Sequence, residues 1–221
     1  MREYYHSELD EVVNQLVTMS DSVQVAVRDA TTALLDANLA AAEHVISGDV
    51  RIDAMHDQLE TRCFTLLARQ APVAGELRII VAAMQVIADL GRTGDLAAHI
   101  AETARRRYPE KAVPDVLVAT FHRMSVVAEA MISKAGRTLA ERDLEEAHTL
   151  PEDDEEMDNL RNEQFRMLAS PNWKDSVEAA VDAALLGRYY ERIADHAVAM
   201  GRRIIYIITG NSPEGEDWPT T

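Results

Sequence analysis

Two acidic residues near the end of the 221-residue chain have a spacing that suits metal coordination. Glu191 and Asp195 are four positions apart in a segment of helical periodicity, so their carboxylates would lie on one face at neighbouring turns. Such a pair can chelate or bridge a hard cation. The alternative is a surface ladder of ion pairs, because Arg188 and Arg192 stand beside the two acids. The spacing alone leaves both interpretations open.

A second polar group lies about one hundred residues earlier. Asp95, His99 and Glu102 share a helical face and could offer mixed oxygen and nitrogen ligands, although an Asp–His hydrogen bond is the simpler alternative. Gly91 stands four residues before Asp95, so the first acid of a pair is missing here. Gly91 and Gly94 each cost about 1 kcal/mol relative to Ala inside a helix. Close helix packing would explain them, as would room for a partner backbone or a bound ion.

The other reactive side chains form no recognisable catalytic motif. The sequence has no glycine-rich phosphate loop, no nucleophile elbow and no His-Glu-x-x-His. Cys63 has no activating partner in a motif, so we expect it in the core. Ferritin-like di-iron sites need two Glu-x-x-His pairs, and the chain has one, Glu145 with His148. The acidic run 152–156 suits the first turn of a helix, where exposed amide groups favour negative charge.

The elements that would position these residues are all predicted to be helices. Apolar residues recur at intervals of three and four along most of the chain, and only 5% of the residues are aromatic. Prolines, glycines and the Ser-Gly-Asp segment at 47–49 mark the expected breaks. We therefore predict an all-α fold, with helices at about residues 7–45, 49–70, 72–108, 114–147, 152–169 and 172–208.

The two halves of the chain resemble each other weakly. At an offset of 100, Arg92 and Asp95 in the third helix match Arg192 and Asp195 in the sixth, and the first and fourth helices align at an offset of 105. Residues 109–114, bracketed by two prolines, separate the halves. The repeat predicts two tandem three-helix bundles, at residues 1–108 and 114–208, followed by a flexible tail at 209–221.

The charge of the chain excludes some classes of partner. Lys and Arg number 22 against 38 Asp and Glu, a formal net charge of −16. This field repels phosphate backbones, so nucleic acid is not expected as a partner. A lone cysteine fits a reducing cytoplasm, and the start of the chain lacks the apolar segment of a secretory signal. The apolar run 204–208 is too short to cross a bilayer, so we expect a cytoplasmic protein without a membrane span.

Together these features resemble the PhoU family, the phosphate-signalling accessory proteins of bacteria. The resemblance rests on the twofold repeat and on two segments: APVAGELR from Ala71 to Arg78, which opens the third helix, and YERIADHA from Tyr190 to Ala197 in the sixth. The second segment is close to the family's Glu-Arg-Ile-Gly-Asp-His-Ala, with Ala194 in place of Gly. The resemblance covers about residues 5–208.

The resemblance implies a metal site in each bundle. Family members carry a Glu/Asp-x-x-x-Asp motif that can hold metal ions; Glu191 and Asp195 match it in full, whereas Asp95 matches only its second acid. The implied cofactor is a divalent or ferric ion, and with His99 added from its spacing the candidate ligands are Glu191, Asp195, Asp95 and His99. Because Gly91 departs from the motif, the two sites are not expected to be equivalent.

The resemblance also implies partners and a role. The implied role is that of a cytoplasmic, non-enzymatic regulator that is associated peripherally with inner-membrane complexes. This regulator couples the phosphate ABC transporter to a phosphate-sensing histidine kinase. The implied partners are that kinase and the transporter's ATPase subunit, and the role is to restrain the phosphate-starvation response. Homodimer formation is a further expectation. Two alternatives stay open: a metal-dependent helical enzyme that uses Glu191 and Asp195, and a structural bundle that acts only by self-association.

Overall fold

The computed structural model describes residues 2–69, 72 and 74–211, and its regular elements are helices. The described residues contain no strand, so the predicted all-α fold is confirmed. The elements are α1 (Arg2–Leu35), α2 (Leu39–Arg69), α3 (Ala74–Arg107), a short 3-10 helix η1 (Asp115–Leu117), α4 (Val118–Glu141), α5 (Leu144–Leu168) and α6 (Val177–Thr209).

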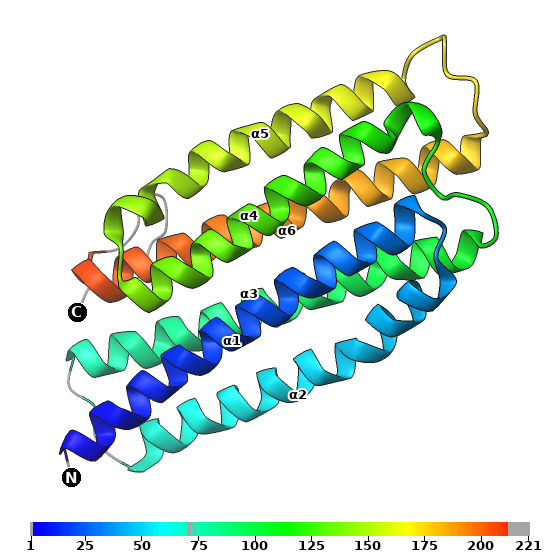
Figure 1. Ribbon diagram of the computed structural model, residues 1–221. Helices are drawn as coiled ribbons and strands as arrows, with labels where there is room; N and C mark the ends of the chain where they lie inside the picture. The colour runs from blue at the N-terminus through cyan, green and yellow to red at the C-terminus, as the bar shows by residue number, and fades with distance from the viewer. Residues whose placement is uncertain (1, 70–71, 73, 212–221) are drawn as a thin grey trace.

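The helices form two groups of three that pack side by side (Figure 1). Helices α1, α2 and α3 contact one another, as do α4, α5 and α6. The groups meet where α1 packs on α4 and α3 packs on α6, which leaves α2 and α5 on the outside (Figure 1). The tandem arrangement predicted from the repeat is therefore present, and its halves share a long interface.

The contacts between α3 and α6 show how the halves are related. Residue numbers rise along one helix as they fall along the other, in the pairs Arg106–Asp182 (3.0 Å), His99–Tyr189 (ring centroids 5.6 Å apart) and Asp89–His196 (3.0 Å). The two helices are therefore antiparallel. At the repeat offset of 100, this pairing is centred near position 94 of α3 and position 194 of α6. Such antiparallel pairing is what an approximate twofold relation between the halves would produce.

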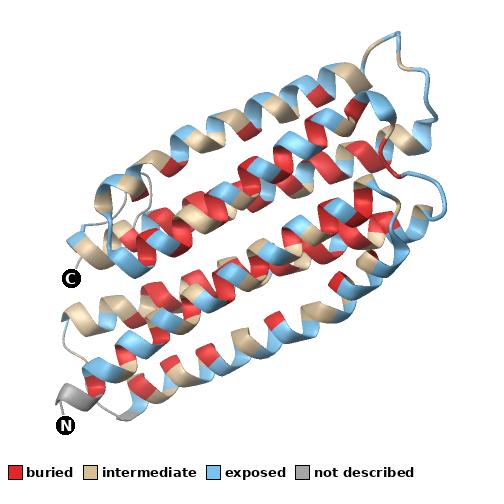
Figure 2. Cartoon of the chain, viewed as in Figure 1, coloured by how far each residue is buried: buried red, intermediate tan, exposed pale blue. Residues whose placement is uncertain are grey.

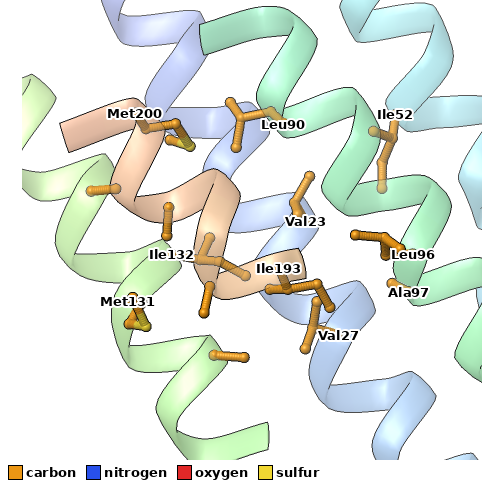
Figure 3. Packing of buried hydrophobic residues seen from close by; sticks show 14 of the residues in the cluster. Val23, Val27, Ile52, Leu90, Leu96, Ala97, Met131, Ile132, Ile193 and Met200 are labelled. Carbon is orange, nitrogen blue, oxygen red and sulfur yellow. The ribbon is translucent and has the colours of Figure 1, made fainter. Parts of the chain in front are cut away.

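One hydrophobic core runs through both groups. Buried side chains line the inward faces of the four central helices (Figure 2). Figure 3 shows Val27 of α1, Ile132 of α4 and Ile193 of α6 among them. Full burial of a Val, Ile or Leu side chain stabilises a fold by roughly 1.5–3 kcal/mol. The shared core therefore explains why the two groups pack as one body.

The first break in the chain is not where the sequence pattern placed it. We expected a stop at 47–49, but α1 ends at Leu35 and Gly48 lies inside α2. The turn uses Ala37 in the left-handed region, with φ of 52°. Asn38 then caps α2, because its Oδ1 accepts a hydrogen bond from the backbone N–H of Ala41 (3.1 Å). The cap, and not the glycine, determines where α2 begins.

The break between the fourth and fifth helices is also displaced. Helix α4 ends at Glu141 and α5 begins at Leu144, after Arg142 in the left-handed region (φ 54°). Asp143 caps α5 by accepting from the N–H of Glu146 (3.0 Å). Pro151 lies inside α5, so the prediction that a helix begins beside it at about residue 152 was wrong. The acidic run 152–156 is mid-helix and does not occupy a first turn.

The last helix begins later than expected. Ser176 is its cap, with Oγ accepting from the N–H of Ala179 (3.1 Å), so the predicted start near residue 172 was wrong. The helix ends at Thr209, and Gly210 follows in the left-handed region (φ 73°). The tail predicted at 209–221 lies, from residue 212 onward, outside the described residues.

Cys63 is fully buried, as predicted for a core residue. Burial raises the pKa of its thiol to about 11, which keeps it in the unreactive thiol form.

The segment Asp115–Glu141 has the length and hydropathy of a membrane span. Its inward face, however, includes fully buried side chains such as Phe121 and Met124, and it packs against α1, α5 and α6. This is the pattern of a core helix.

Candidate functional site

Glu191 and Asp195 lie on the outer face of α6, beside α5. Glu191 forms ion pairs with Arg188 on its own helix (2.7 Å) and with Arg161 on α5 (3.3 Å). Asp195 is more exposed, with 55% of its side chain accessible, and Arg188 lies 4.0 Å away. The ladder of ion pairs that the spacing allowed is therefore present. It holds the two carboxylates on one face, as the helical spacing required.

Helix α5 adds acids that were not among the candidate metal ligands predicted from the sequence. Asp154 and Asp158 are also four residues apart, and both act electrostatically on the same region. Burial, followed by the charges of Asp158, Asp195 and Glu191, raises the pKa of Asp154 to about 6. Burial and the charge of Glu191 also raise the pKa of Asp195. Four carboxylates from two helices thus repel one another at this site, which we call the α5–α6 acidic cluster.

The α5–α6 acidic cluster has the chemistry that a cation would satisfy. Asp154 Oδ1 is buried and accepts no hydrogen bond from the residues that the structure describes, and a buried unpaired carboxylate oxygen is costly. Hard cations prefer such oxygens. Within the described ranges, however, no three His, Cys, Asp or Glu side chains are placed to hold a metal ion directly. A bound cation would therefore require the acids to rotate toward one another and Glu191 to leave its arginine partners.

The raised pKa of Asp154 predicts a specific pH dependence of stability. Because the folded-state pKa lies above the ordinary value of 3.8, the folded protein holds this proton more tightly than the unfolded chain. The stabilisation is present in full below about pH 4 and is lost as the pH rises through about 6. In EDTA, Asp154→Asn should thus raise the unfolding temperature at pH 7 and leave it nearly unchanged at pH 4.

The matched control for this prediction is Glu155→Gln, which removes one charge from an exposed position on the same helix. Thermal unfolding followed by circular dichroism at both pH values gives the comparison. If Asp154→Asn and Glu155→Gln shift the unfolding temperature equally at pH 7, the buried repulsion assigned to Asp154 is absent.

Asp95 and His99 lie in the other half, next to α2. Asp95 pairs with Arg92 (3.4 Å), and His99 Nδ1 lies 3.2 Å from Glu102 Oε2. The ring of His99 also contacts Tyr189 of α6. The alternative of an Asp95–His99 hydrogen bond is therefore not what forms: Asp95 pairs with Arg92, and His99 pairs with Glu102. These residues therefore lie apart from Glu191 and Asp195, which face α5.

Helix α2 supplies acids to this second group, as α5 does to the first. Burial, followed by the charges of Asp53 and Asp95, raises the pKa of Asp49. Asp49 and Asp53 again have a spacing of four. The spacing of four residues between two acids could have identified both pairs, Asp49 with Asp53 and Asp154 with Asp158, from the sequence. However, whether these pairs lie beside the acids of α3 and α6 depends on how the helices are aligned along their length, which the sequence pattern did not establish.

The two glycines of α3 are explained by close packing. A Cβ at Gly91 would lie 3.1 Å from Cδ2 of His56, and a Cβ at Gly94 would lie 3.0 Å from Cγ2 of Ile52. Both neighbours come from α2. The imidazole of His56 thus occupies the space beside Gly91, where the equivalent residue in the other half is Glu191. Of the two explanations for these glycines, the structure supports close helix packing.

Comparison with known proteins finds the same similarity in both halves. A family model described as the PhoU domain matches residues 16–104 and 121–204. In Mycobacterium tuberculosis (strain H37Rv), "Phosphate-specific transport system accessory protein PhoU homolog 1" is 44% identical over 220 residues, covering 100% of both chains. The corresponding protein of Aquifex aeolicus, also titled a PhoU homolog, is 33% identical over 205 residues, or 92% of each chain.

Solved structures agree with this comparison. The crystal structure of PhoU from Pseudomonas aeruginosa has a TM-score of 0.88 and 27% identity, and the match covers 94% of this chain and 100% of that one. A Streptococcus pneumoniae structure titled as the phosphate transport system regulatory protein PhoU has a TM-score of 0.86, with coverage of 95% and 99%. At 22% identity, the latter shows the fold alone.

Proposed function

Because the chain belongs to the PhoU family, we propose that it is an accessory regulator of phosphate transport that acts by binding other proteins. The observation that carries this proposal is the domain match in each half, supported by relatives that match at least 96% of this chain and are titled as accessory proteins of the phosphate-specific transport system. In finer terms, we propose that it couples the ABC transporter to a phosphate-sensing histidine kinase in the cytoplasm. There it restrains the starvation response when phosphate is plentiful and turns over no substrate.

The architecture supports a binding role. In the described part of the chain, the outer helices α2 and α5 each have one side that no other helix covers (Figure 1). Such faces are suited to contact with helical parts of a kinase or an ATPase subunit. The −16 charge favours partner surfaces with basic residues and makes the strength of association depend on ionic strength.

The first experiment measures association directly. The purified chain is immobilised and exposed to the purified cytoplasmic part of the kinase and to the transporter's ATPase subunit, each at low and at high phosphate. We expect binding that changes with phosphate concentration. Absence of binding to both proteins at every phosphate level would contradict the proposed coupling role.

We also propose that a divalent or ferric ion binds the α5–α6 acidic cluster through Glu191 and Asp195, with Asp154 and Asp158 as neighbours. Asp95 and His99, with Asp49 close by, are the weaker candidates in the other half, because Gly91 supplies no carboxylate. When bound, the ion would neutralise the repulsion between the acids. The chain's own contribution is to hold the carboxylates of two neighbouring helices close together, with Asp154 Oδ1 unpaired among the described residues.

If the chain binds a metal ion, its folded state should become more stable, and this change can be measured without an activity assay. A ligand that binds only the folded state at 100 times its dissociation constant stabilises it by about 2.7 kcal/mol. Titration with iron, manganese, magnesium or zinc should raise the unfolding temperature of the wild-type chain. The double change Glu191→Ala with Asp195→Ala should abolish that rise, while Asp95→Ala should reduce it less. An unchanged unfolding temperature with all four metals would remove the metal proposal.

A further inference from the structure

The outer surface between α1 and α2 carries a groove with a volume of about 360 Å³. It extends from Thr18 to Asp29 along α1 and from His44 to Met55 along α2, which is roughly 16 Å at a rise of 1.5 Å per residue. Its floor is apolar or small, formed by Val25, Ala26, Val45, Gly48, Ile52 and Met55. Val25 is 42% exposed.

The packing of the described helices does not require a glycine at position 48. It lies in the interior of α2, where glycine costs about 1 kcal/mol relative to Ala. Within the part of the chain that the structure describes, a Cβ at Gly48 would meet no neighbouring heavy atom within 4 Å. By contrast, Gly136, Gly187 and Gly201 each lie so close to a neighbouring side chain that an added Cβ would clash. The space above Gly48 is therefore kept open on the outside of the molecule, at the floor of the groove.

The second half closes the equivalent groove with ion pairs. The repeat offset of 105 that aligns α1 with α4 also aligns the cap residues Asn38 and Asp143. At this offset Gly48 corresponds to Asp153, which pairs with Lys134 across the α4–α5 surface. Two further ion pairs, Arg123–Glu156 and Arg137–Glu146, cross the same surface. The counterparts of Lys134 and Asp153 in the first half are Asp29 and Gly48, which cannot form such a pair.

The two rims of the α1–α2 groove carry charges of opposite sign. Asp21 lies on the α1 side and Arg51 on the α2 side, both are exposed, and neither has an ion pair within the described part of the chain. Asp29, further along the α1 rim, forms an ion pair with its neighbour Arg28 on the same helix (3.4 Å). Toward the other end of the helix pair, Arg62 joins Glu8 (3.1 Å) and closes the surface. The groove therefore does not extend along the whole length of α1 and α2.

We propose that the α1–α2 groove binds one amphipathic helix of a partner protein, about three turns long. Its apolar residues would face Val25, Ile52 and Met55, and a small residue would approach α2 closely at Gly48. Its basic edge would lie along Asp21 and Asp29 and its acidic edge beside Arg51. The inference rests on the proposed function, since it gives the regulator a specific docking surface for one of its protein partners.

The decisive variant fills the groove without disturbing the core. Gly48→Trp places an indole in open space, so the chain should fold, as circular dichroism and thermal unfolding would verify. Its matched control is Val50→Trp on the same helix, at a 69% exposed position outside the groove. The probes are the purified cytoplasmic part of the kinase and the purified ATPase subunit. Gly48→Trp should weaken binding of one of them at least tenfold, whereas Val50→Trp should bind as wild type does.

A second variant protects the test if Gly48→Trp fails to fold. Val25→Glu introduces a charge on the exposed floor of the groove and should weaken the same interaction. If wild type binds a partner and both folded variants bind it equally well, the groove proposal is wrong and the regulatory proposal stands. If wild type binds neither probe, both fail. If sedimentation shows a wild-type dimer that Gly48→Trp converts to monomer, the occupant is a second copy, which also overturns the proposal.

Discussion

Replacement of Tyr190 by Ala is expected to lower the free energy of unfolding by roughly 3–5 kcal/mol, the range for deletion of a large buried aromatic side chain. Tyr190 is fully buried and joins three helices of the two halves. From α6, its hydroxyl lies 2.7 Å from Thr31 Oγ1 on α1, and its ring lies 5.9 Å from the ring of Phe121 on α4. The change therefore leaves a cavity where the two groups of helices meet.

Two further variants separate packing from hydrogen bonding at this position. Tyr190→Phe removes only the hydroxyl and should cost about 1 kcal/mol, because Thr31 still donates to the carbonyl of Val27 (2.8 Å). Tyr189→Ala is the matched control on the neighbouring, only partly buried residue and should cost much less than Tyr190→Ala. Urea unfolding with linear extrapolation measures all three. A cost for Tyr190→Ala no larger than that for Tyr189→Ala would refute the shared core.

Substitution of Gly187 by Ala should also destabilise the chain, by roughly 1–3 kcal/mol, although Ala is normally the better helix former. A Cβ at Gly187 would clash with Gln164 Oε1 and would lie 2.7 Å from its Cδ. Gln164 is fully buried, and its amide donates a hydrogen bond to the carbonyl of Ala183. The side chain cannot move aside without loss of that bond, so α5 and α6 must separate.

The same substitution at Gly48 provides the matched control. An added Cβ there meets no described neighbour within 4 Å, so Gly48→Ala should stabilise the chain by about 0.5–1 kcal/mol. The two variants carry the same chemical change in helix interiors and should differ in sign. If the Gly187→Ala variant were as stable as wild type, the close approach of α5 to α6 would be wrong.

The sequence predicted the helices well and the breaks between them less well. The three-and-four spacing follows from burial on one helix face, so it located the long buried stripes of α1, α3 and α6. Breaks depend on local capping that spacing does not reveal. Gly48 and Pro151 looked like helix ends, yet both lie inside helices. The actual turns use Ala37 and Arg142 in the left-handed region, which few non-glycine residues adopt.

The candidate site was predictable within each helix but not between helices. The spacing of Glu191 and Asp195 placed them correctly on one face of α6. Their neighbours Asp154 and Asp158 were missed because the register of α5 against α6 depends on the connection from Ala169 to Ser176 and on the Gln164–Gly187 contact. The expected start of α6, near residue 172, was about one turn before the observed start at Val177.

The measurement that tests the regulatory account most directly is phosphate-controlled gene expression in cells that lack this protein. A reporter of the starvation response is followed at high and at low phosphate, with and without the full chain restored from a plasmid. The account predicts constitutive induction at high phosphate in the deletion strain and renewed repression when the chain is supplied. A deletion strain that still represses the reporter normally at high phosphate would contradict it.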